Sequence, residues 1–237
     1  KIVNLNMDWS QAPSVVETNG AARLAPVAES QFEQYTFNTP KDDLEHLRNM
    51  VAGLALRTPR ELAIVEVGSW VGESALAMAD GLGPEGGRIY CVDHWLGTAG
   101  EHSRGWAELR DPYPIFEKNC GERLNKVIFP VRGKSLDCAA SWPEQVDMVY
   151  IDADHSYEAV KADIDAWMPH VRDGGILAGH DYGGKMFPGV TRAVQQRFAD
   201  RTLFGWQLNI EGNIWWVKID RATQDKPYLT GTSHLHV

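Results

Sequence analysis

The sequence predicts an α/β protein with a doubly wound, mainly parallel, seven-stranded sheet and a C-terminal antiparallel hairpin. Between residues 63 and 200, short apolar runs alternate with stretches of helical periodicity. This alternation is typical of βαβ units, which build a parallel sheet. Near the C-terminus, two apolar runs at 206–210 and 214–219 flank the turn Glu-Gly-Asn at 211–213, which predicts the hairpin.

Each element has its own local signal. A first helix is expected at 41–57, because leucine and valine residues recur at helical spacing and Asp42 and Asp43 lie in the first turn. Gly174 and Gly175 are expected to separate an amphipathic helix, whose apolar face extends to Val171, from the next strand. The other helices are expected at 73–82, 115–124, 136–141 and 190–200, and the strands at 63–67, 88–92, 127–131, 146–151, 176–179, 206–210 and 214–219.

Length and composition indicate one globular domain. The chain has 237 residues, of which 43% are hydrophobic and 23% are charged, and these values suit a protein with a sizeable core. We expect an N-terminal cap or lid at 1–40, a catalytic core at 41–220 and a C-terminal tail at 221–237.

Charge and cysteine content limit the classes of function. The net charge of −9 argues against binding to a nucleic-acid backbone, so a small-molecule substrate is expected. Three cysteines without a Cys-x-x-Cys pair fit a reducing cytoplasm. No apolar run approaches the ~18 residues of a membrane span. The sequence therefore predicts a cytoplasmic protein that binds neither nucleic acid nor membrane.

A glycine-rich segment, Glu-Val-Gly-Ser-Trp-Val-Gly-Glu-Ser at 66–74, follows the first predicted strand. Glycine lets a ligand approach the backbone, and the next helix N-terminus offers free N–H groups. The spacing Gly-x-x-x-Gly differs from that of dinucleotide-binding enzymes, and an ordinary turn is the alternative. The second strand ends at Asp93, 25 positions after Gly68, where a carboxylate can accept both ribose hydroxyls or simply serve as a loop residue. Together the two features favour a cofactor site. After the third strand, Ser135 either contacts an adenine or caps the next helix.

Acidic and histidine side chains follow the fourth and fifth predicted strands. The fourth is followed by Asp-Ala-Asp-His-Ser-Tyr at 152–157 and the fifth by His-Asp-Tyr at 180–182. The carboxyl ends of parallel strands share one edge of a sheet, so these clusters are expected around one cleft. Such groups are costly to bury unless they are paired or metal-bound. Alternatively, Asp154 or Ser156 caps the helix and His180 is a satisfied loop histidine.

These motifs resemble those of the class I S-adenosylmethionine-dependent methyltransferases, over residues 63–182. Val-Glu-Val-Gly-Ser-Trp-Val-Gly at 65–72 resembles the first family motif, and Tyr-Cys-Val-Asp at 90–93 resembles the second. The two strand-end clusters are similar to those of the metal-dependent O-methyltransferases, nearest to the macrocin and mycinamicin sugar enzymes and the cephalosporin-type relatives. Catechol and caffeoyl-CoA O-methyltransferases are more distant.

The resemblance implies a Rossmann-like methyltransferase fold, S-adenosylmethionine as cofactor and a homo-oligomer. The residues expected to bind the cofactor are Glu66, Gly68, Ser69, Gly72, Ser74, Asp93, His94, Trp95, Ser135 and Asp152. A divalent metal, Mg²⁺ or Mn²⁺, is expected on Asp152, His180 and Asp181, with His155 as the general base and with Asp152 and His180 also in catalytic roles. The family usually has Asp or Glu where this chain has His180. Imidazole suits Mn, Fe, Ni or Zn better than Mg, so substrate contact or acid–base work by His180, or a metal-free enzyme, stays open.

Residues 94–112 form the longest stretch without periodicity, and we interpret them as a lid or substrate wall rather than a surface excursion. The expected substrate contacts are His102, Trp106 and Tyr182. Trp95, close to Asp93, is expected to flank the adenine or the substrate. On the hairpin, alternation is expected to send one of Trp215 and Trp216 inward and the other outward.

The predicted function is transfer of a methyl group to a hydroxyl of a sugar-bearing natural product or another small diol. A metal would lower the pKa of the hydroxyl, and a histidine would accept its proton. A catechol or phenolic acceptor is one alternative. A nicotinamide-dependent oxidoreductase is another, although we interpret Tyr157 and Lys161, four positions apart, as a helix feature. A cofactor-binding subunit without activity is disfavoured by the presence of Asp152, His155 and Asp181.

Overall fold

The computed structural model describes residues 39–98, 103, 107, 111–199 and 206–221. They fall within one compact unit, Thr39–Val237. The cap or lid expected at 1–40 lies outside the described residues except for its last two positions, and so does the tail after residue 221. Among the described residues, no helix is long and apolar enough to cross a membrane.

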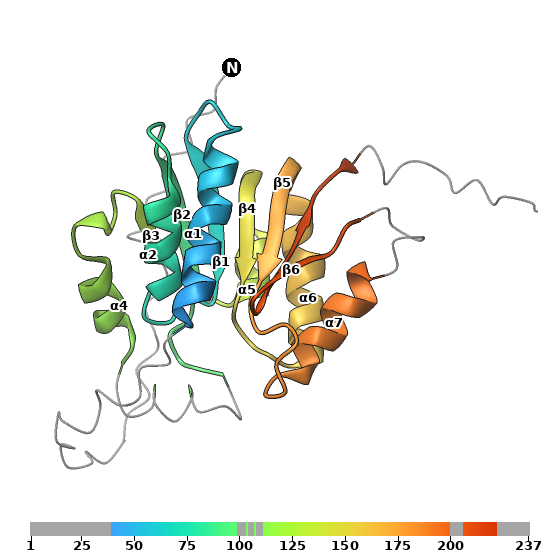
Figure 1. Cartoon of the computed structure of the whole chain (residues 1–237). Helices are drawn as coiled ribbons and strands as arrows, with labels where there is room; N and C mark the ends of the chain where they lie inside the picture. Colours follow the sequence, from blue (N-terminus) through green and yellow to red (C-terminus); the bar gives the residue numbers. More distant parts are fainter. Residues whose placement is uncertain (1–38, 99–102, 104–106, 108–110, 200–205, 222–237) are drawn as a thin grey trace, which may run out of the picture. The chain divides into compact units, whose positions relative to one another are not determined.

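The described residues form one seven-stranded sheet with the order β3-β2-β1-β4-β5-β7-β6 (Figure 1). The strands from β3 to β5 run parallel, whereas β7 is antiparallel to both β5 and β6. This confirms the predicted parallel sheet with a terminal hairpin. The strands are β1 (Leu62–Val67), β2 (Gly87–Asp93), β3 (Ile128–Arg132), β4 (Val146–Ile151), β5 (Val171–Gly179), β6 (Asn209–Glu211) and β7 (Ile214–Lys218).

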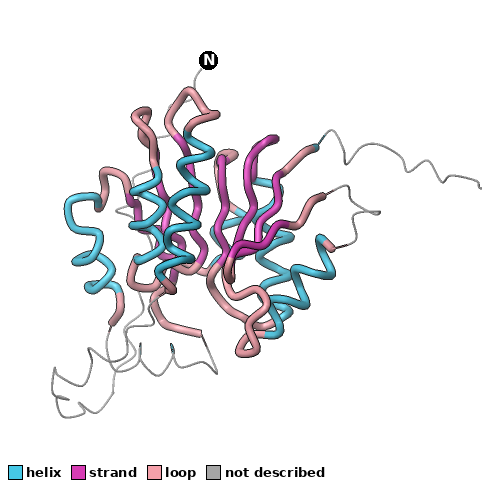
Figure 2. Tube along the Cα trace, viewed as in Figure 1, coloured by secondary structure: helices cyan, strands magenta, loops and turns pink. Residues whose placement is uncertain are grey.

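Helices cover both faces of the sheet, as Figure 2 shows by the cyan segments around the magenta strands. One buried cluster joins the sheet to α1, α2 and α4, and a second joins it to α5, α6 and α7. Each helix buries one apolar side against the strands, which is the driving force for the layered arrangement. The helices are α1 (Lys41–Ala55), α2 (Glu73–Gly81), α4 (Tyr113–Cys120), α5 (Ser135–Ala140), α6 (Tyr157–Trp167) and α7 (Pro188–Phe198).

The two tryptophans of β7 lie on opposite faces, as alternation requires. Trp215 is fully buried in the layer of α5, α6 and α7, and Trp216 packs against the layer that contains α1. The two side chains therefore alternate as expected, and Trp216 is partly buried because helices cover the second face of the sheet as well.

Strand β5 starts earlier than the sequence predicts. Val171 is its first residue rather than the end of a helical face, since α6 ends at Trp167 and a short 3₁₀ turn with Pro169 follows. Proline has no backbone N–H, so Pro169 cannot continue the α-helical hydrogen bonds, which explains this end. Gly174 and Gly175 lie inside the strand, where Gly174 has a φ of +79° and the register with β4 shifts. The glycines therefore permit a local irregularity and do not end the element.

Two other boundaries differ from the prediction. The helix expected at 115–124 ends at Cys120, because Gly121 adopts a φ of +51° and leads into a 3₁₀ turn. The strand expected at 206–210 is only Asn209–Glu211. Trp206 precedes it and stacks on Phe198 of α7, with ring centroids 5.2 Å apart. Its burial explains the apolar signal that extends the predicted strand.

Candidate active site

The loop between β1 and α2 lies against the end of β4. Gly68 has a φ of +87°, and a Cβ at this position would lie 2.2 Å from the carbonyl oxygen of Asp152. The amide of Asp152 donates a hydrogen bond of 2.8 Å to the carbonyl of Val67. Only glycine permits this approach. The predicted glycine loop and the predicted acidic cluster therefore meet at β1 and β4, where the order of the sheet reverses and ligands of such folds bind.

Asp93 holds the same loop from the end of β2. Its Oδ2 accepts hydrogen bonds from the amides of Ser69 (3.0 Å) and Trp70 (2.8 Å), and its Oδ1 accepts one from the amide of Trp95 (2.6 Å). Trp70 has a φ of +43°, a conformation that costs energy for a non-glycine residue and is offset by such bonds. The predicted ribose-binding carboxylate thus also shapes the backbone of the loop.

Glu66 and Ser74 lie beneath the loop rather than on its ligand-facing side. Both are buried, and the hydroxyl of Ser74 donates a hydrogen bond to the carboxyl of Glu66. Burial raises the pKa of Glu66 to about 7, although hydrogen bonds from the neighbouring serines and Cys91 act to lower it. The expectation that these two side chains contact the cofactor was based on their position in the motif, and the structure places them in a supporting layer.

Trp95 is also a buried support. Its side chain is 2% exposed, its indole N–H donates to the carbonyl of Trp70 at 2.7 Å, and its ring packs against Tyr113 and Phe116. A φ of +55° turns the residue back under the loop. The structure therefore does not present this ring to an adenine or a substrate. His94 is more exposed, and its Nδ1 accepts a hydrogen bond from the amide of Leu96.

The hydroxyl of Ser135 is used inside the protein. It donates to the carboxyl of Asp163 and accepts a hydrogen bond of 2.9 Å from the indole of Trp167. Lys134, not Ser135, occupies the N-cap position of α5, and no side chain caps this helix. The capping alternative for Ser135 was therefore wrong, and its contact with an adenine stays a prediction.

Four predicted residues from two neighbouring strand ends come together. His155 Nε2 lies 3.0 Å from Asp181 Oδ2 and 3.7 Å from Asp152 Oδ1. His180 Nδ1 lies 3.5 Å from Asp181 Oδ2 and 3.9 Å from Asp152 Oδ1. Potential ligand atoms of Asp152, His155 and Asp181 all lie within 4.8 Å of one another, a spacing that suits a metal ion. This group has His155 where the expected metal set of Asp152, His180 and Asp181 has His180.

The charges of this cluster shift its pKa values. Burial would raise the pKa of Asp181, but hydrogen bonds from His155 and His180 hold it well below its ordinary range. Burial would lower the pKa of His180, yet the hydrogen bond to Asp181 and the charges of Asp152 and Asp181 raise it to about 9. Asp181 is therefore ionised at neutral pH and stabilises positive charge placed beside it.

Asp43 is a member of the site that sequence reasoning missed. It lies in the first turn of α1, is 2% exposed, and its Oδ2 is 3.1 Å from His180 Nε2. The backbone amide and the side-chain amide of Asn213 also donate to its carboxylate. The sequence marks Asp43 only as a helix-start acid, because no local pattern shows a contact across 137 positions.

The ring of His155 is stacked on the ring of Phe187, with centroids 3.9 Å apart and an interplanar angle of 23°. The side chain of His155 is 17% exposed, so it is partly accessible. Ser156 is the N-cap residue of α6 and accepts a hydrogen bond from the amide of Ala159, which confirms the capping alternative. Asp154 accepts from the amide of Ser156 and thus also shapes this turn.

Several other predicted contacts can be placed. The hydroxyl of Tyr182 accepts a hydrogen bond of 3.2 Å from Gln195 of α7. Tyr157 bonds to Gln196, and Lys161 pairs with Asp165 at 2.7 Å, so this pair is a helix feature as expected. His102 and Trp106, expected to contact the substrate, lie outside the described residues together with most of the predicted lid.

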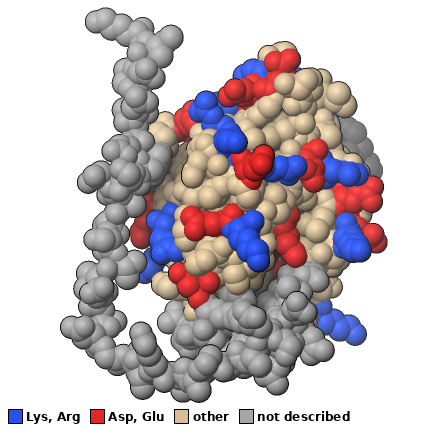
Figure 3. Space-filling view, turned by 90° about the vertical axis from the view of Figure 1, so that its left-hand side faces the viewer, with Lys and Arg blue, Asp and Glu red and all other residues tan. Residues whose placement is uncertain are grey.

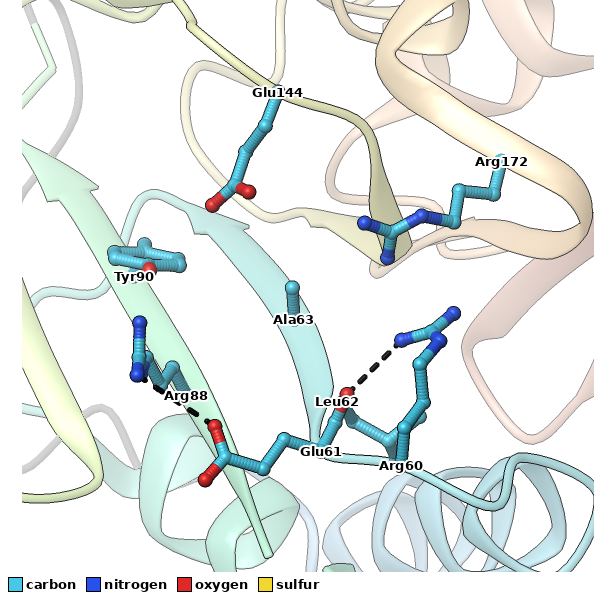
Figure 4. Close-up of a pocket in the computed structure, with 8 residues that line it drawn as sticks. All are labelled: Arg60, Glu61, Leu62, Ala63, Arg88, Tyr90, Glu144 and Arg172. Atoms are coloured by element: carbon cyan, nitrogen blue, oxygen red, sulfur yellow. Dashed lines mark hydrogen bonds and ion pairs between the residues drawn. The ribbon is translucent and has the colours of Figure 1, made fainter. Parts of the chain in front are cut away.

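A hollow with a volume of about 400 Å³ lies at the amino ends of the strands (Figure 4). Its three arginines are paired: Arg60 and Arg172 bind the buried Asp147, and Arg88 lies 3.6 Å from Glu61. Each arginine thus has a carboxylate partner, and Arg60 and Arg172 share that of Asp147. This end of the sheet is stabilised by ion pairs and lies opposite the acidic cluster. The residues that line the hollow are Arg60, Glu61, Leu62, Ala63, Arg88, Tyr90, Glu144 and Arg172.

Comparisons with known proteins agree with this geometry. A family model described as a methyltransferase domain matches residues 65–182, the range from β1 to the second strand-end cluster. The O-methyltransferase NovP is 20% identical, with 76% of this chain and 80% of that chain covered and a TM-score of 0.56. An O-methyltransferase from Bacillus cereus in complex with SAH is 16% identical, with 80% and 86% covered and a TM-score of 0.56. CalS11, a TDP-rhamnose 3'-O-methyltransferase of calicheamicin biosynthesis, is 15% identical, with 82% and 87% covered and a TM-score of 0.51. The chain therefore carries a methyltransferase domain at residues 65–182, on the fold of the solved O-methyltransferase structures.

Proposed function

We propose that this methyltransferase transfers the methyl group of S-adenosylmethionine to a hydroxyl of a small molecule. The observation that carries the proposal is the cluster of Asp152, His155, His180 and Asp181 beside the Gly68 loop. An alcohol is a poor nucleophile until it loses its proton, and this cluster provides a base and a set of carboxylates at the expected place. The solved structures described as O-methyltransferases support a hydroxyl acceptor.

The cofactor would bind along the glycine loop. The backbone at Gly68, Ser69 and Gly72 opens onto the N-terminus of α2, and Asp93 offers carboxylate oxygens to the ribose hydroxyls. Asp152 borders this loop and the acidic cluster, so the reacting sulfonium and the acceptor oxygen would meet beside it. Holding sulfur, methyl carbon and oxygen in line supplies the proximity contribution to the rate.

His155 is the proposed general base. Its imidazole would take the proton of the acceptor hydroxyl while the oxygen attacks the methyl carbon and the bond from carbon to sulfur breaks. The resulting imidazolium would be stabilised by Asp181 at 3.0 Å and Asp152 at 3.7 Å. Stacking on Phe187 restricts the orientation of the ring before the reaction. A positioned base of this kind contributes about 10²–10⁴-fold to a rate.

The donor set fits a divalent cation. Asp152 and Asp181 supply oxygen atoms, and an imidazole from the same cluster supplies nitrogen. When bound, a divalent cation such as Mg²⁺ or Mn²⁺ would lower the pKa of a hydroxyl that contacts it. Because His155 is assigned as the base, His180 is the nitrogen donor in this proposal.

We propose a sugar-bearing natural product or another vicinal diol as the acceptor class. A second hydroxyl next to the reacting one allows the acceptor to bind at two points, because the strand-end cluster has several carboxylate and imidazole groups. The name of CalS11 gives one sugar acceptor in this fold. On the face drawn in Figure 3, basic and acidic side chains are interspersed among the described residues, without a continuous basic stripe. That distribution favours a small molecule over a nucleic acid for this face.

Calorimetric titration with S-adenosylmethionine and with NADH, followed by mass spectrometry of a panel of hydroxylated acceptors, tests the proposal. We expect S-adenosylmethionine to bind, NADH not to bind, and a diol acceptor to gain one methyl group. Amine or thiol acceptors in place of hydroxyl acceptors would contradict the assignment of the reaction. Activity that is unchanged in the presence of EDTA would contradict the proposed metal site but not the proposed methyl transfer.

A further inference from the structure

His180 is held from both sides of its ring. On one side, Nε2 lies 3.1 Å from Oδ2 of Asp43. On the other side, Nδ1 faces Asp181 at 3.5 Å and Asp152 at 3.9 Å. The side chain of His180 is 9% exposed and that of Asp43 is 2% exposed, so this pairing is formed away from water. The two ring nitrogens therefore have separate tasks, one toward a buried carboxylate and one toward the proposed metal site.

The position of Asp43 is built by a segment far away in the chain. Asn213, in the turn between β6 and β7, donates its amide to Oδ1 at 3.1 Å and its side-chain N–H to Oδ2 at 2.8 Å. A Cβ on Gly212 would lie 2.2 Å from Oδ1 of Asp43, so the turn needs a glycine there to leave space for the carboxylate. A buried carboxylate is costly unless it is satisfied, and this one has three donors. Their bonds hold the pKa of Asp43 below its ordinary value although burial opposes this.

A histidine that binds a metal through one nitrogen generally donates its other N–H to a carboxylate or a carbonyl. That second bond selects the tautomer and the ring orientation, so that the lone pair is directed at the metal. The contact from Asp43 to Nε2 has this form, because it would keep a proton on Nε2 when a metal displaces the proton that Nδ1 shares with Asp181, which would free the lone pair on Nδ1. The lone pair then points to the side where Asp152 and Asp181 offer oxygen atoms.

We propose that Asp43 is a positioning residue, which fixes His180 so that Nδ1 completes a mixed nitrogen and oxygen donor set with Asp152 and Asp181. This inference rests on the metal site of the proposed function and adds the residue that orients its unusual ligand. A nitrogen donor favours Mn²⁺, Co²⁺, Ni²⁺ or Zn²⁺ relative to Mg²⁺, which prefers oxygen. The expected occupant is therefore a transition metal such as Mn²⁺.

Binding of Mn²⁺, followed by electron paramagnetic resonance without any methyl donor or acceptor, tests this inference. We expect Asp43→Asn, which has nearly the same shape, to weaken Mn²⁺ binding about 10–100-fold, as is usual for loss of a group that orients a ligand. The matched control is Asp42→Asn, one residue earlier on the exposed side of α1, which should bind Mn²⁺ like the wild type. In a His180→Gln background, Asp43→Asn should cause little further loss, because Asp43 acts through the ring that is gone.

The outcomes separate this inference from the proposed function. If Asp152→Asn abolishes Mn²⁺ binding while Asp43→Asn leaves it unchanged, the metal site stands and the role of Asp43 is overturned. If additive losses occur in the His180→Gln background, Asp43 acts on the fold in general and the inference is also overturned. A wild-type protein that binds no Mn²⁺, or an Asp152→Asn variant that binds Mn²⁺ normally, overturns both the proposed metal site and the role of Asp43.

A measurement on the unsubstituted protein makes the test independent of the folding of any variant. In the wild type labelled with ¹⁵N-histidine and loaded with Zn²⁺, His180 should keep a proton on Nε2 and show a shifted Nδ1 signal. A Zn²⁺-induced shift at Nε2, or no shift at Nδ1, would contradict the proposed orientation. A merely structural ion pair would leave both ring signals insensitive to the metal.

Discussion

The contact between the glycine loop and the end of β4 predicts a large effect of Gly68→Ala. A Cβ would lie 2.2 Å from the carbonyl oxygen of Asp152, against about 3.0 Å for the shortest normal contact, so the two segments must separate by about 0.8 Å. Two backbone hydrogen bonds of 2.8 Å lie at this point, from Gly68 to the carbonyl of Val92 and from Asp152 to the carbonyl of Val67. Each buried donor left without a partner costs about 1–3 kcal/mol. The positive φ adds about 1–2 kcal/mol for alanine.

The expected loss for Gly68→Ala is therefore about 3–8 kcal/mol in the free energy of unfolding. The matched control is Gly86→Ala, because Gly86 has a similar φ of +73° but no atom within 4 Å of the added Cβ. Its loss should be confined to the contribution of the backbone angle, about 1–2 kcal/mol. Urea unfolding followed by circular dichroism gives both values, and calorimetry gives the affinity for S-adenosylmethionine. Equal losses in the two variants would refute the argument from close approach.

Three further predictions concern single side chains. Burial opposes a low pKa for Asp147, but hydrogen bonds from Arg60 and the charge of Arg172 hold this pKa below 3.8. The ionised carboxylate therefore stabilises the fold at neutral pH, and this stabilisation is lost as the pH falls through the lowered pKa. Unfolding in urea at several pH values should therefore show a steeper loss below pH 3.8 in the wild type than in Asp147→Asn. Burial raises the pKa of Asp163 to about 6, so the wild type should become more stable as the pH falls through 6 towards 3.8, by up to about 3 kcal/mol. Asp163→Asn should remove this pH dependence, and an unchanged profile would contradict the burial of a charge there. His155→Ala should lower kcat about 10²–10⁴-fold with little change in the affinity for S-adenosylmethionine, as single-turnover kinetics and calorimetry can check, and full activity would exclude it as the base.

The parts of the fold that follow from local pattern could be predicted from the sequence. Strand β4 was predicted at its observed bounds, because a run of apolar residues between polar segments reads as a buried parallel strand. The convergence of His155 with Asp181 was predicted for a topological reason. Residues that follow adjacent parallel strands must share one edge of the sheet, whatever the details of the loops.

The parts that depend on packing could not be predicted. A motif position does not show whether a side chain points to the ligand or below the loop, and Glu66 and Trp95 both point below it. The pairing of Asp43 with His180 depends on how α1 docks on the sheet, which no local periodicity describes. The start of β5 at Val171 was missed because glycines usually end a strand, whereas here they form an irregularity within it.

The support of His180 comes from outside the segment that carries the family motifs. Asp43 precedes residues 65–182 and Asn213 follows them, so both flanks of the chain act on one ligand of the proposed site. The motif segment could therefore stay unchanged while exchange of the first helix or the last hairpin altered which cation is bound. Such flanking elements offer a means of adapting the proposed metal chemistry that is independent of the strand-end cluster. A chimera that keeps residues 65–182 and replaces either flank would keep the strand-end cluster but lose contacts that hold the ring of His180.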